Sequence, residues 1–435
     1  SAGGEREHRR NDRPDMTSSA ASIDDLRDFL DASPSPFHAV HRASRRLADA
    51  GFADAREGDS DRLAERGVVA RDGALIAWSA APGAAPGTPF SIVGAHSDSP
   101  CLRVKPRPET ERSGWRQLNV EVYGGILNNS WLDRDLGLAG RVVGDDGSSR
   151  LLDVREPIAR VPQLAVHLDR GVNDGLTLDP QAHLQPVWAV GPAAAPFREW
   201  LAGRAGLDRP PTFWDLCLYD VQPSAVLGVD RSMLASGRLD NLVSCWAGTT
   251  ALIDASPTAG HAVLVLNDHE EVGSSSATGA AGALLERILE RLSATFGGDR
   301  SDHMRALDAS QCVSADNAHA VHPNYPERHD PDHMPRFNAG PAIKVNANQR
   351  YATSAVTAQR FGAACERAGV PHQVFVSRNN MPCGSTIGPI TATRLGIDTV
   401  DVGVPQLSMH SARELCGTAD PVWLTAALTE LLGDA

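Results

Sequence analysis

The sequence is poor in cysteine and contains no long apolar run. Its seven cysteines among 435 residues are scattered, and no two form a C-x-x-C pair. This argues against a disulfide scaffold or a thiolate zinc cluster and fits a reducing compartment. The longest apolar run, Ala262–Leu266, is far shorter than the roughly 20 residues of a membrane span. Since the first thirty residues also lack the apolar core of a signal peptide, we expect a cytoplasmic protein that does not bind membranes.

An excess of positive charge is also missing. Lys and Arg number 41 and Asp and Glu number 54, which gives a formal net charge of −13. Such a chain repels phosphate backbones, so we expect no nucleic-acid partner. Hydrophobic residues make up 42% and charged residues 22%, a balance typical of folded proteins. The length predicts two to three folding units.

The pattern along the chain predicts an α/β fold with an insertion. Residues 1–16 hold no large apolar residue before Met16 and are predicted to be a disordered tail. Helices are predicted at residues 23–30 and 36–50, and residues 74–79 and 90–95 are predicted to form a hairpin. From 239 onward helical and strand patterns alternate, ending with a strand at 398–402 and a helix at 421–432. This alternation predicts a mixed sheet covered by helices on both faces.

The sequence pattern of residues 102–232 differs from that of the rest of the chain. Short β-like runs lie between clusters of Gly, Pro and Asp, and helical periodicity is weak. We therefore predict a β-rich domain at 102–232, inserted between two parts of the α/β domain at 17–101 and 233–435.

Polar residues follow apolar runs at five places. These clusters contain His96 with Asp98, Asp240, Glu270 with Glu271, Asp316 with His319, and His410. Taken singly, such residues have ordinary structural roles, for example a helix N-cap for Asp240. In an α/β sheet, however, loops at the carboxyl ends of the strands form the ligand crevice. Because the five polar clusters recur at predicted strand ends, we expect them to form one shared site.

Imidazoles and carboxylates without a nearby thiolate suit Zn²⁺, Co²⁺ or Mn²⁺. Five ligands are too many for one catalytic ion with an open position, and they suit two ions that share a bridging carboxylate. One residue of the Glu270–Glu271 pair could bind metal while the other acts as general base. Asp98 could accept a hydrogen bond from the His96 ring and fix its tautomer.

Seven colinear motifs resemble the aspartyl aminopeptidase family, the M18 di-metal aminopeptidases. They extend over most of the chain from about residue 22 to 430: GAHSDSPCLRVKP (94–106), SGRLDNL (236–242), NDHEEVGSSSATGA (267–280), SADNAHAVHPNYPERH (314–329), IKVNANQRYAT (343–353), MPCGSTIGP (381–389) and MHSARE (409–414).

The resemblance implies a role for each matching residue. One ion is held by His96 and Asp316, the second by Glu271 and His410, and Asp240 bridges them. Glu270 is the implied general base, with Asp98 as the partner of His96. His319, Lys344 and Tyr351 match positions that line the substrate site, and His167 matches a histidine supplied across a subunit interface.

The implied fold is an α/β peptidase domain interrupted by a β-rich dimerisation domain, assembled into a homo-dodecamer. The implied activity is removal of an N-terminal residue, preferably acidic, from peptides with a free N-terminus. Two other readings remain open at this stage. A different di-metal amidohydrolase, such as a deacylase, would use the same ions, and a catalytically silent cargo or scaffold shell would use the same fold.

Overall fold

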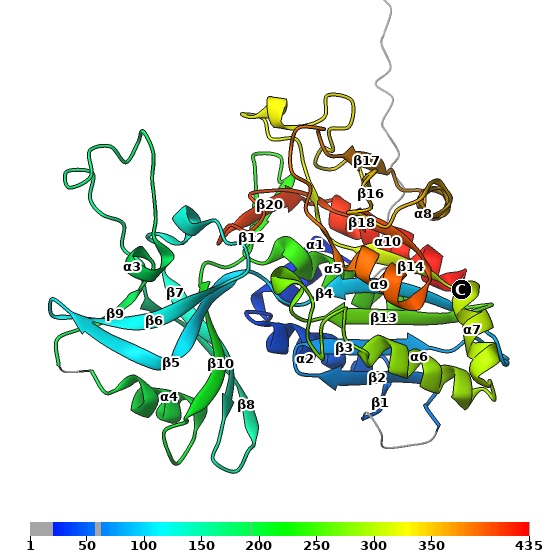
Figure 1. Ribbon diagram of the computed structural model, residues 1–435, viewed down its shortest axis with the longest axis horizontal. Helices are drawn as coiled ribbons and strands as arrows, with labels where there is room; N and C mark the ends of the chain where they lie inside the picture. Colours follow the sequence, from blue (N-terminus) through cyan, green and yellow to red (C-terminus); the bar gives the residue numbers. More distant parts are fainter. Residues whose placement is uncertain (1–20, 57–61, 193, 435) are drawn as a thin grey trace, which may run out of the picture.

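The computed structural model describes residues 21–56, 62–192 and 194–434 (Figure 1). The predicted tail at 1–16 lies outside these residues. The two predicted N-terminal helices are present as α1 (Ile23–Asp31) and α2 (Pro36–Asp49). Each begins after a serine, Ser22 or Ser35, whose side chain accepts a backbone N–H of the first turn, as expected of an N-cap.

A nine-stranded mixed sheet forms the larger part of the molecule. Its strand order is β1-β2-β3-β13-β4-β14-β18-β16-β17. The four neighbouring strands β13, β4, β14 and β18 are parallel to one another. The strands are β1 (Ala53–Asp54), β2 (Arg66–Arg71), β3 (Ala74–Ser79), β4 (Phe90–His96), β13 (His261–Asn267), β14 (Gln311–Ala315), β16 (Ala342–Val345), β17 (Gln373–Val376) and β18 (Asp398–Gly403).

The hairpin predicted from 74–79 and 90–95 is wrong, although both segments are strands. β13 lies between β3 and β4, and it pairs antiparallel with β3 and parallel with β4. All seven residues of β13 are buried. A strand buried on both of its faces belongs in the interior of a sheet. β13 takes such a place between β3 and β4, which are consecutive in the sequence.

Helices cover both faces of this sheet, as predicted. Alternate residues of one strand point to opposite faces, and in β4 Val93 belongs to one apolar cluster and Ile92 to the other. The first cluster contains residues of α1, α2, α5 (Leu239–Asp254), α8 (Ala355–Arg367) and α10 (Asp420–Gly433). The second contains residues of α6 (Leu284–Thr295) and α7 (Arg300–Asp308), with Leu395 of α9 (Ile387–Leu395) packed against it.

A six-stranded antiparallel sheet lies to one side of the nine-stranded sheet (Figure 1). Its order is β8-β7-β10-β5-β6-β9, and it has a separate apolar core. The strands are β5 (Cys101–Arg112), β6 (Trp115–Tyr123), β7 (Leu136–Val143), β8 (Ser149–Ala159), β9 (Val187–Val190) and β10 (Phe213–Asp220), with short helices α3 (Pro180–His183) and α4 (Phe197–Ala205). All six strands fall within the segment whose sequence is β-rich. Its role in dimerisation stays a prediction.

A third sheet consists of five short strands in the order β11-β12-β20-β19-β15. They are β11 (Ala225–Leu227), β12 (Met233–Ser236), β15 (Ala318–His319), β19 (Pro405–Leu407) and β20 (Glu414–Gly417). The prediction that 398–402 is the last strand is therefore wrong. β19 and β20 have only three and four residues, too few to show a period in the sequence.

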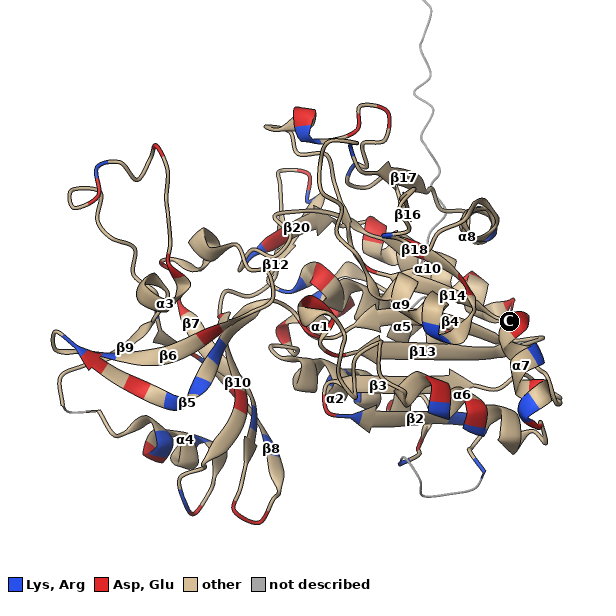
Figure 2. Ribbon diagram, in the orientation of Figure 1, with Lys and Arg blue, Asp and Glu red and all other residues tan. Residues whose placement is uncertain are grey.

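Positively and negatively charged residues occur together on several helices and strands. Figure 2 shows acidic and basic residues interspersed on α6, α7 and β5. Among the described residues, no helix combines the length and the apolar character that crossing a bilayer requires.

Candidate metal centre

Three parallel neighbouring strands carry part of the predicted site at their carboxyl ends. β4 ends at His96, and β14 ends just before Asp316. β13 leads through two residues into a single 3₁₀ turn that begins with Glu270 and Glu271. Because Asn267 of β13 pairs in register with His96, the ends of these strands lie at one edge of the sheet, where an α/β fold places its ligands.

The remaining two predicted ligands come from the five-stranded sheet. Asp240 follows β12, and His410 lies in the loop between β19 and β20. β12 pairs directly with β20, so these two loops emerge side by side. Asp240 is not an N-cap, because α5 begins after Arg238 and has no side-chain cap.

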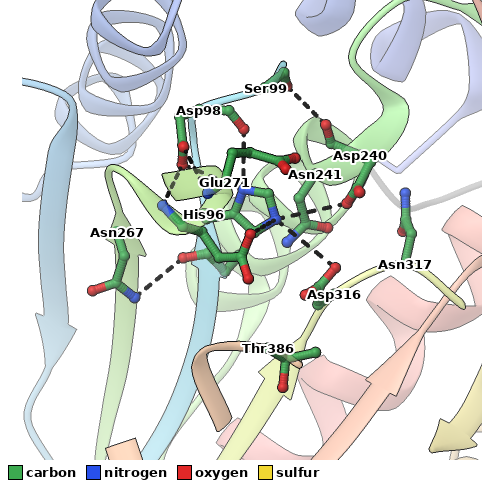
Figure 3. A network of polar contacts seen from close by, with 12 residues as sticks. His96, Asp98, Ser99, Asp240, Asn241, Asn267, Glu271, Asp316, Asn317 and Thr386 are labelled. Atoms are coloured by element: carbon green, nitrogen blue, oxygen red, sulfur yellow. Dashed lines mark hydrogen bonds and ion pairs between the residues drawn. The ribbon is translucent and has the colours of Figure 1, made fainter. Parts of the chain in front are cut away.

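The five predicted ligands converge on one site, and Figure 3 shows four of them, His96, Asp240, Glu271 and Asp316. His96 Nε2 lies 3.6 Å from Asp240 Oδ1 and 3.8 Å from Asp316 Oδ1. His410 Nε2 lies 3.3 Å from Asp240 Oδ2 and 3.3 Å from Glu271 Oε2. The two oxygens of Asp240 thus face two different imidazoles.

The predicted ligand atoms lack hydrogen-bond partners, and their spacing suits coordination of divalent cations. His96 Nε2, Asp240 Oδ1 and Glu271 Oε1 are buried and have no hydrogen-bond partner, which is costly unless another group satisfies them. One ligand atom from each of these three residues lies within 4.8 Å of the others. Around a tetrahedral ion with ligands at roughly 2.1 Å, neighbouring ligand atoms are about 3.4 Å apart. The separations of 3.3–3.8 Å between the imidazole nitrogens and the carboxylate oxygens are close to this value.

Both imidazoles are oriented by backbone carbonyls. His96 Nδ1 lies 3.0 Å from the Asp98 carbonyl oxygen, and His410 Nδ1 lies 2.9 Å from that of Gly125. A carbonyl oxygen only accepts, so each Nδ1 is the donor and each Nε2 faces the pocket. This is the usual arrangement of metal-binding histidines. The Asp98 carboxylate is also near His96, with Oδ1 at 3.4 Å from Nδ1.

The Asp98 carboxylate also positions the loop that carries the two glutamates. Its Oδ1 accepts the backbone N–H of Glu270 and its Oδ2 that of Glu271, each at 3.1 Å. Tyr123 donates its hydroxyl to the same Oδ2 at 2.7 Å. Since Asp98 is fully buried, these bonds to a carboxylate are of the strong, charge-assisted kind.

Crowded carboxylates dominate the electrostatics of the pocket. Burial lowers the pKa of His96, but the Asp240 carboxylate and its neighbours raise it well above its ordinary value. In the same way Asp240 and Glu271 outweigh burial and raise the pKa of His410 to about 10. Burial raises the pKa of Glu270 to about 7. The pocket therefore attracts positive charge, which divalent cations supply.

Three of the four predicted substrate-binding residues lie together beside this pocket. Lys344 is only 2% exposed, and its Nζ lies 3.3 Å from the Asn317 carbonyl oxygen and 5.0 Å from the ring centre of Tyr351. Rings of Tyr351 and His319 pack edge to face against Phe375. Lys344 thus places a buried ammonium beside the backbone of the residue that follows Asp316.

The fourth residue, His167, is not brought to the metal pocket of its own chain. It is exposed, in the long connection between β8 and α3, which extends away from the nine-stranded sheet in Figure 1. Leu164, Val166 and Leu168 around it are 56%, 50% and 75% exposed.

Sequence reasoning gave no role to two residues that support the site. Tyr123 ends a strand of the six-stranded sheet and reaches Asp98. Glu414 is buried and accepts the backbone N–H groups of Asp240 and His410. Burial raises the pKa of Glu414 to about 8. Glu414 lies in the motif 409–414, whereas Tyr123 lies in no motif and had no local signal.

A pocket of imidazoles and carboxylates at the carboxyl edge of a mixed α/β sheet defines a metal-dependent hydrolase. Comparisons with known proteins assign the family. Residues 29–431 match the family described as "Aminopeptidase I zinc metalloprotease (M18)". The chain therefore belongs to the M18 family of zinc metallo-aminopeptidases.

The relatives cover almost the whole chain. A Streptomyces coelicolor protein described as "Probable M18 family aminopeptidase 2" is 55% identical over 94% of this chain and 97% of its own length. Its Mycobacterium tuberculosis counterpart is 47% identical over 95% and 98%. Among solved structures, Ape4 in the cryo-EM structure of the Ape4 and Nbr1 complex is similar with a TM-score of 0.90, 34% identity, and coverage of 94% of this chain and 86% of that chain. The S. cerevesiae mApe1 dodecamer has a TM-score of 0.81, 27% identity, and coverage of 94% and 95%.

Proposed function

We propose that this enzyme removes the N-terminal residue, preferably Asp or Glu, from peptides by means of two divalent metal ions. The observation that carries this proposal is the position of Asp240, whose two oxygens face His96 on one side and His410 on the other. A carboxylate placed in this way suits the bridge of a two-metal site. Zinc is the first choice, and Co²⁺ and Mn²⁺ remain alternatives because they accept the same ligands.

The ligands divide into two sets around Asp240. His96 and Asp316 form the first set, and Glu271 and His410 form the second, which matches the pairs of short separations described above. When bound, such ions polarise a carbonyl group and lower the pKa of a water molecule. The other contributions to the reaction come from side chains of the chain.

Glu270 is the proposed general base. Its Oε2 lies 3.9 Å from His96 Nε2, so its carboxylate faces the same site as the proposed ligands. Glu270 accepts a proton from the attacking water and returns it to the amine that leaves. Asp98 keeps Glu270 in place through the backbone N–H, and holds the adjacent Glu271 in the same way.

The preference for an acidic N-terminal residue rests on Lys344. Its ammonium group is a point charge in a buried position, where attraction to a substrate carboxylate is strengthened by exclusion of water. Tyr351 and His319 form the apolar and aromatic wall beside it.

Assembly completes the site in this proposal. Residues 102–232 act as a dimerisation domain, and His167 of one subunit reaches the active site of another, where it helps to hold the reacting carbonyl oxygen. The chain then forms a homo-dodecamer in the cytoplasm, like the dodecamer of its structural relative mApe1. The exposed apolar residues around His167 support a contact between subunits.

One assay separates this function from its two alternatives. The purified enzyme is given a peptide with a free N-terminal Asp and the same peptide with an acetylated N-terminus, each with and without a chelator. We expect cleavage of the free peptide only, abolished by chelator and restored by zinc. Cleavage of the acetylated peptide would indicate a deacylase-like amidohydrolase. A chain that binds zinc and cleaves neither peptide would indicate a scaffold shell.

A further inference from the structure

Two loops that follow different strands carry Asp240 and His410. Asp240 lies at the start of α5, where its own φ and ψ are not helical, and His410 lies between β19 and β20. His410 has a positive φ of 67°, and Arg238, two residues before Asp240, has a φ of 59°. Such conformations are unfavourable for residues with a Cβ and persist only where the surroundings fix them. Something in the structure must therefore hold both loops.

Glu414 touches both loops at once. Its Oε2 accepts the backbone N–H of Asp240 at 2.9 Å, and its Oε1 accepts that of His410 at 2.7 Å. The side chain is buried, and the ion pairs of the described residues include none to Glu414. Its two oxygens are thus committed to these two N–H groups.

The backbone of Glu414 is itself fixed. It is the first residue of β20 and pairs in register with Ser236, the last residue of β12. The next residue, Leu415, pairs with both Ala235 and Leu407, on the strands to either side. The carboxylate therefore projects from a paired strand at the point where the segment carrying Asp240 begins and the loop carrying His410 ends.

We propose that Glu414 is a positioning residue that sets the separation of Asp240 and His410 and thereby the affinity of the second metal position. This inference rests on the proposed two-metal function. One planar carboxylate holds two N–H groups at a fixed distance, so the Oδ2 of Asp240 and the Nε2 of His410 are kept 3.3 Å apart. The first metal position depends on it less, because His96 is the last residue of β4 and Asp316 follows β14, both in the nine-stranded sheet.

The remaining contacts of the two ligands agree with this role. Ser99 donates its hydroxyl to the Asp240 carbonyl oxygen at 2.7 Å, so the peptide groups on both sides of this residue are held. The Gly125 carbonyl fixes the ring of His410, whereas Glu414 holds the backbone N–H groups of both ligands.

The test is the zinc affinity of Glu414→Gln. An amide offers one acceptor and places an NH₂ group against the other N–H, which releases one loop. Purified full-length wild type and variant are dialysed against buffers of graded free Zn²⁺, and bound zinc is measured by elemental analysis. We expect two zinc ions per wild-type chain, and a 10- to 100-fold weaker second zinc in the variant. Peptidase activity of the variant then recovers as free zinc is raised.

Asp420→Asn is the matched control. Asp420 is also fully buried and accepts two backbone N–H groups, those of Asn338 at 2.6 Å and Gly340 at 2.9 Å. The substitution Asp420→Asn should lower the melting temperature as Glu414→Gln does, but it should leave the affinities of both zinc positions unchanged. Equal zinc affinities in wild type and Glu414→Gln would overturn the proposal.

A second variant covers the case in which Glu414→Gln does not fold. Glu414→Asp keeps the charge but is one methylene shorter and cannot reach both N–H groups, so it should also weaken the second zinc. Unchanged affinity in this variant counts against the role. A wild-type chain that binds no zinc contradicts the two-metal function itself, which is a different outcome from two zinc ions that are indifferent to Glu414.

Discussion

The hydroxyl of Tyr123 donates a 2.7 Å hydrogen bond to the carboxylate of Asp98. Tyr123 is the last residue of β6 in the six-stranded sheet, whereas Asp98 follows β4 of the nine-stranded sheet. Asp98 in turn accepts the backbone N–H of Glu270. A strand of the six-stranded sheet therefore contacts the carboxylate that holds the loop of the proposed general base.

Replacement of Tyr123 by Phe removes this hydrogen bond and nothing else from the ring. A hydrogen bond to a charged group contributes about 1.5–3 kcal/mol, and loss of such a supporting partner typically lowers activity about 10- to 100-fold. We expect kcat to fall in this range while bound zinc stays at the wild-type level. Tyr219→Phe is the control, because Tyr219 donates a comparable 2.6 Å bond to Asp153 within the six-stranded sheet. Equal losses of kcat in both variants would contradict a link to the site.

Glu270→Gln tests the general base. The amide cannot accept the proton of the attacking water, so kcat should fall by at least about 10²- to 10⁴-fold. Because the five proposed metal ligands all remain in this variant, zinc content should not change. Glu271→Gln is the contrasting variant and should lose zinc, since Glu271 Oε2 lies 3.3 Å from His410 Nε2. Near-normal turnover in purified Glu270→Gln would remove it from this role.

The sequence predicted which side chains would meet because each proposed site residue lies at or near a structural boundary. His96 ends β4, Asp316 follows β14 directly and Glu270 follows β13 after two residues, and the parallel register of those strands brings them to one edge. Asp240 and His410 were found through the same kind of signal, although the sheet that carries them is made of strands too short to recognise.

What the sequence did not reveal depends on contacts between distant segments. The position of β13 between β3 and β4 follows from burial on both of its sides, which no local pattern records. The role of Glu414 depends on the backbone N–H groups of two other residues. Asp240 is 174 residues away from Glu414 in the sequence, and His410 is four residues away. A buried carboxylate with backbone partners has no signature in side-chain spacing.

Lys344→Met tests the acidic preference. The thioether side chain fills a similar volume without charge, and loss of one partner of a buried charge pair costs about 2–5 kcal/mol. We expect kcat/KM for peptides with N-terminal Asp or Glu to fall by about 30-fold or more, with a much smaller change for N-terminal Ala or Leu. The sequence contains one other lysine, Lys105, which is exposed to a greater degree than Lys344 and provides the control Lys105→Met. A uniform loss across all peptides in Lys344→Met would place the side chain in folding rather than specificity.

His167→Ala tests whether subunits share active sites. His167 is exposed, in the connection between β8 and α3 that extends away from the nine-stranded sheet (Figure 1), so its removal should abolish activity only if it acts on another copy. The decisive measurement is a mixture of two inactive variants, His167→Ala and Glu270→Gln, co-expressed as one assembly. In a mixed assembly some sites combine an intact Glu270 with an intact His167 from a neighbour, about one quarter of them for equal random mixing. Activity near that fraction is expected from the co-expressed assembly, and none from the two variants purified and assayed separately. If the co-expressed assembly stays inactive although both chains are present in it, His167 does not act across the interface, and the exposed loop serves another contact.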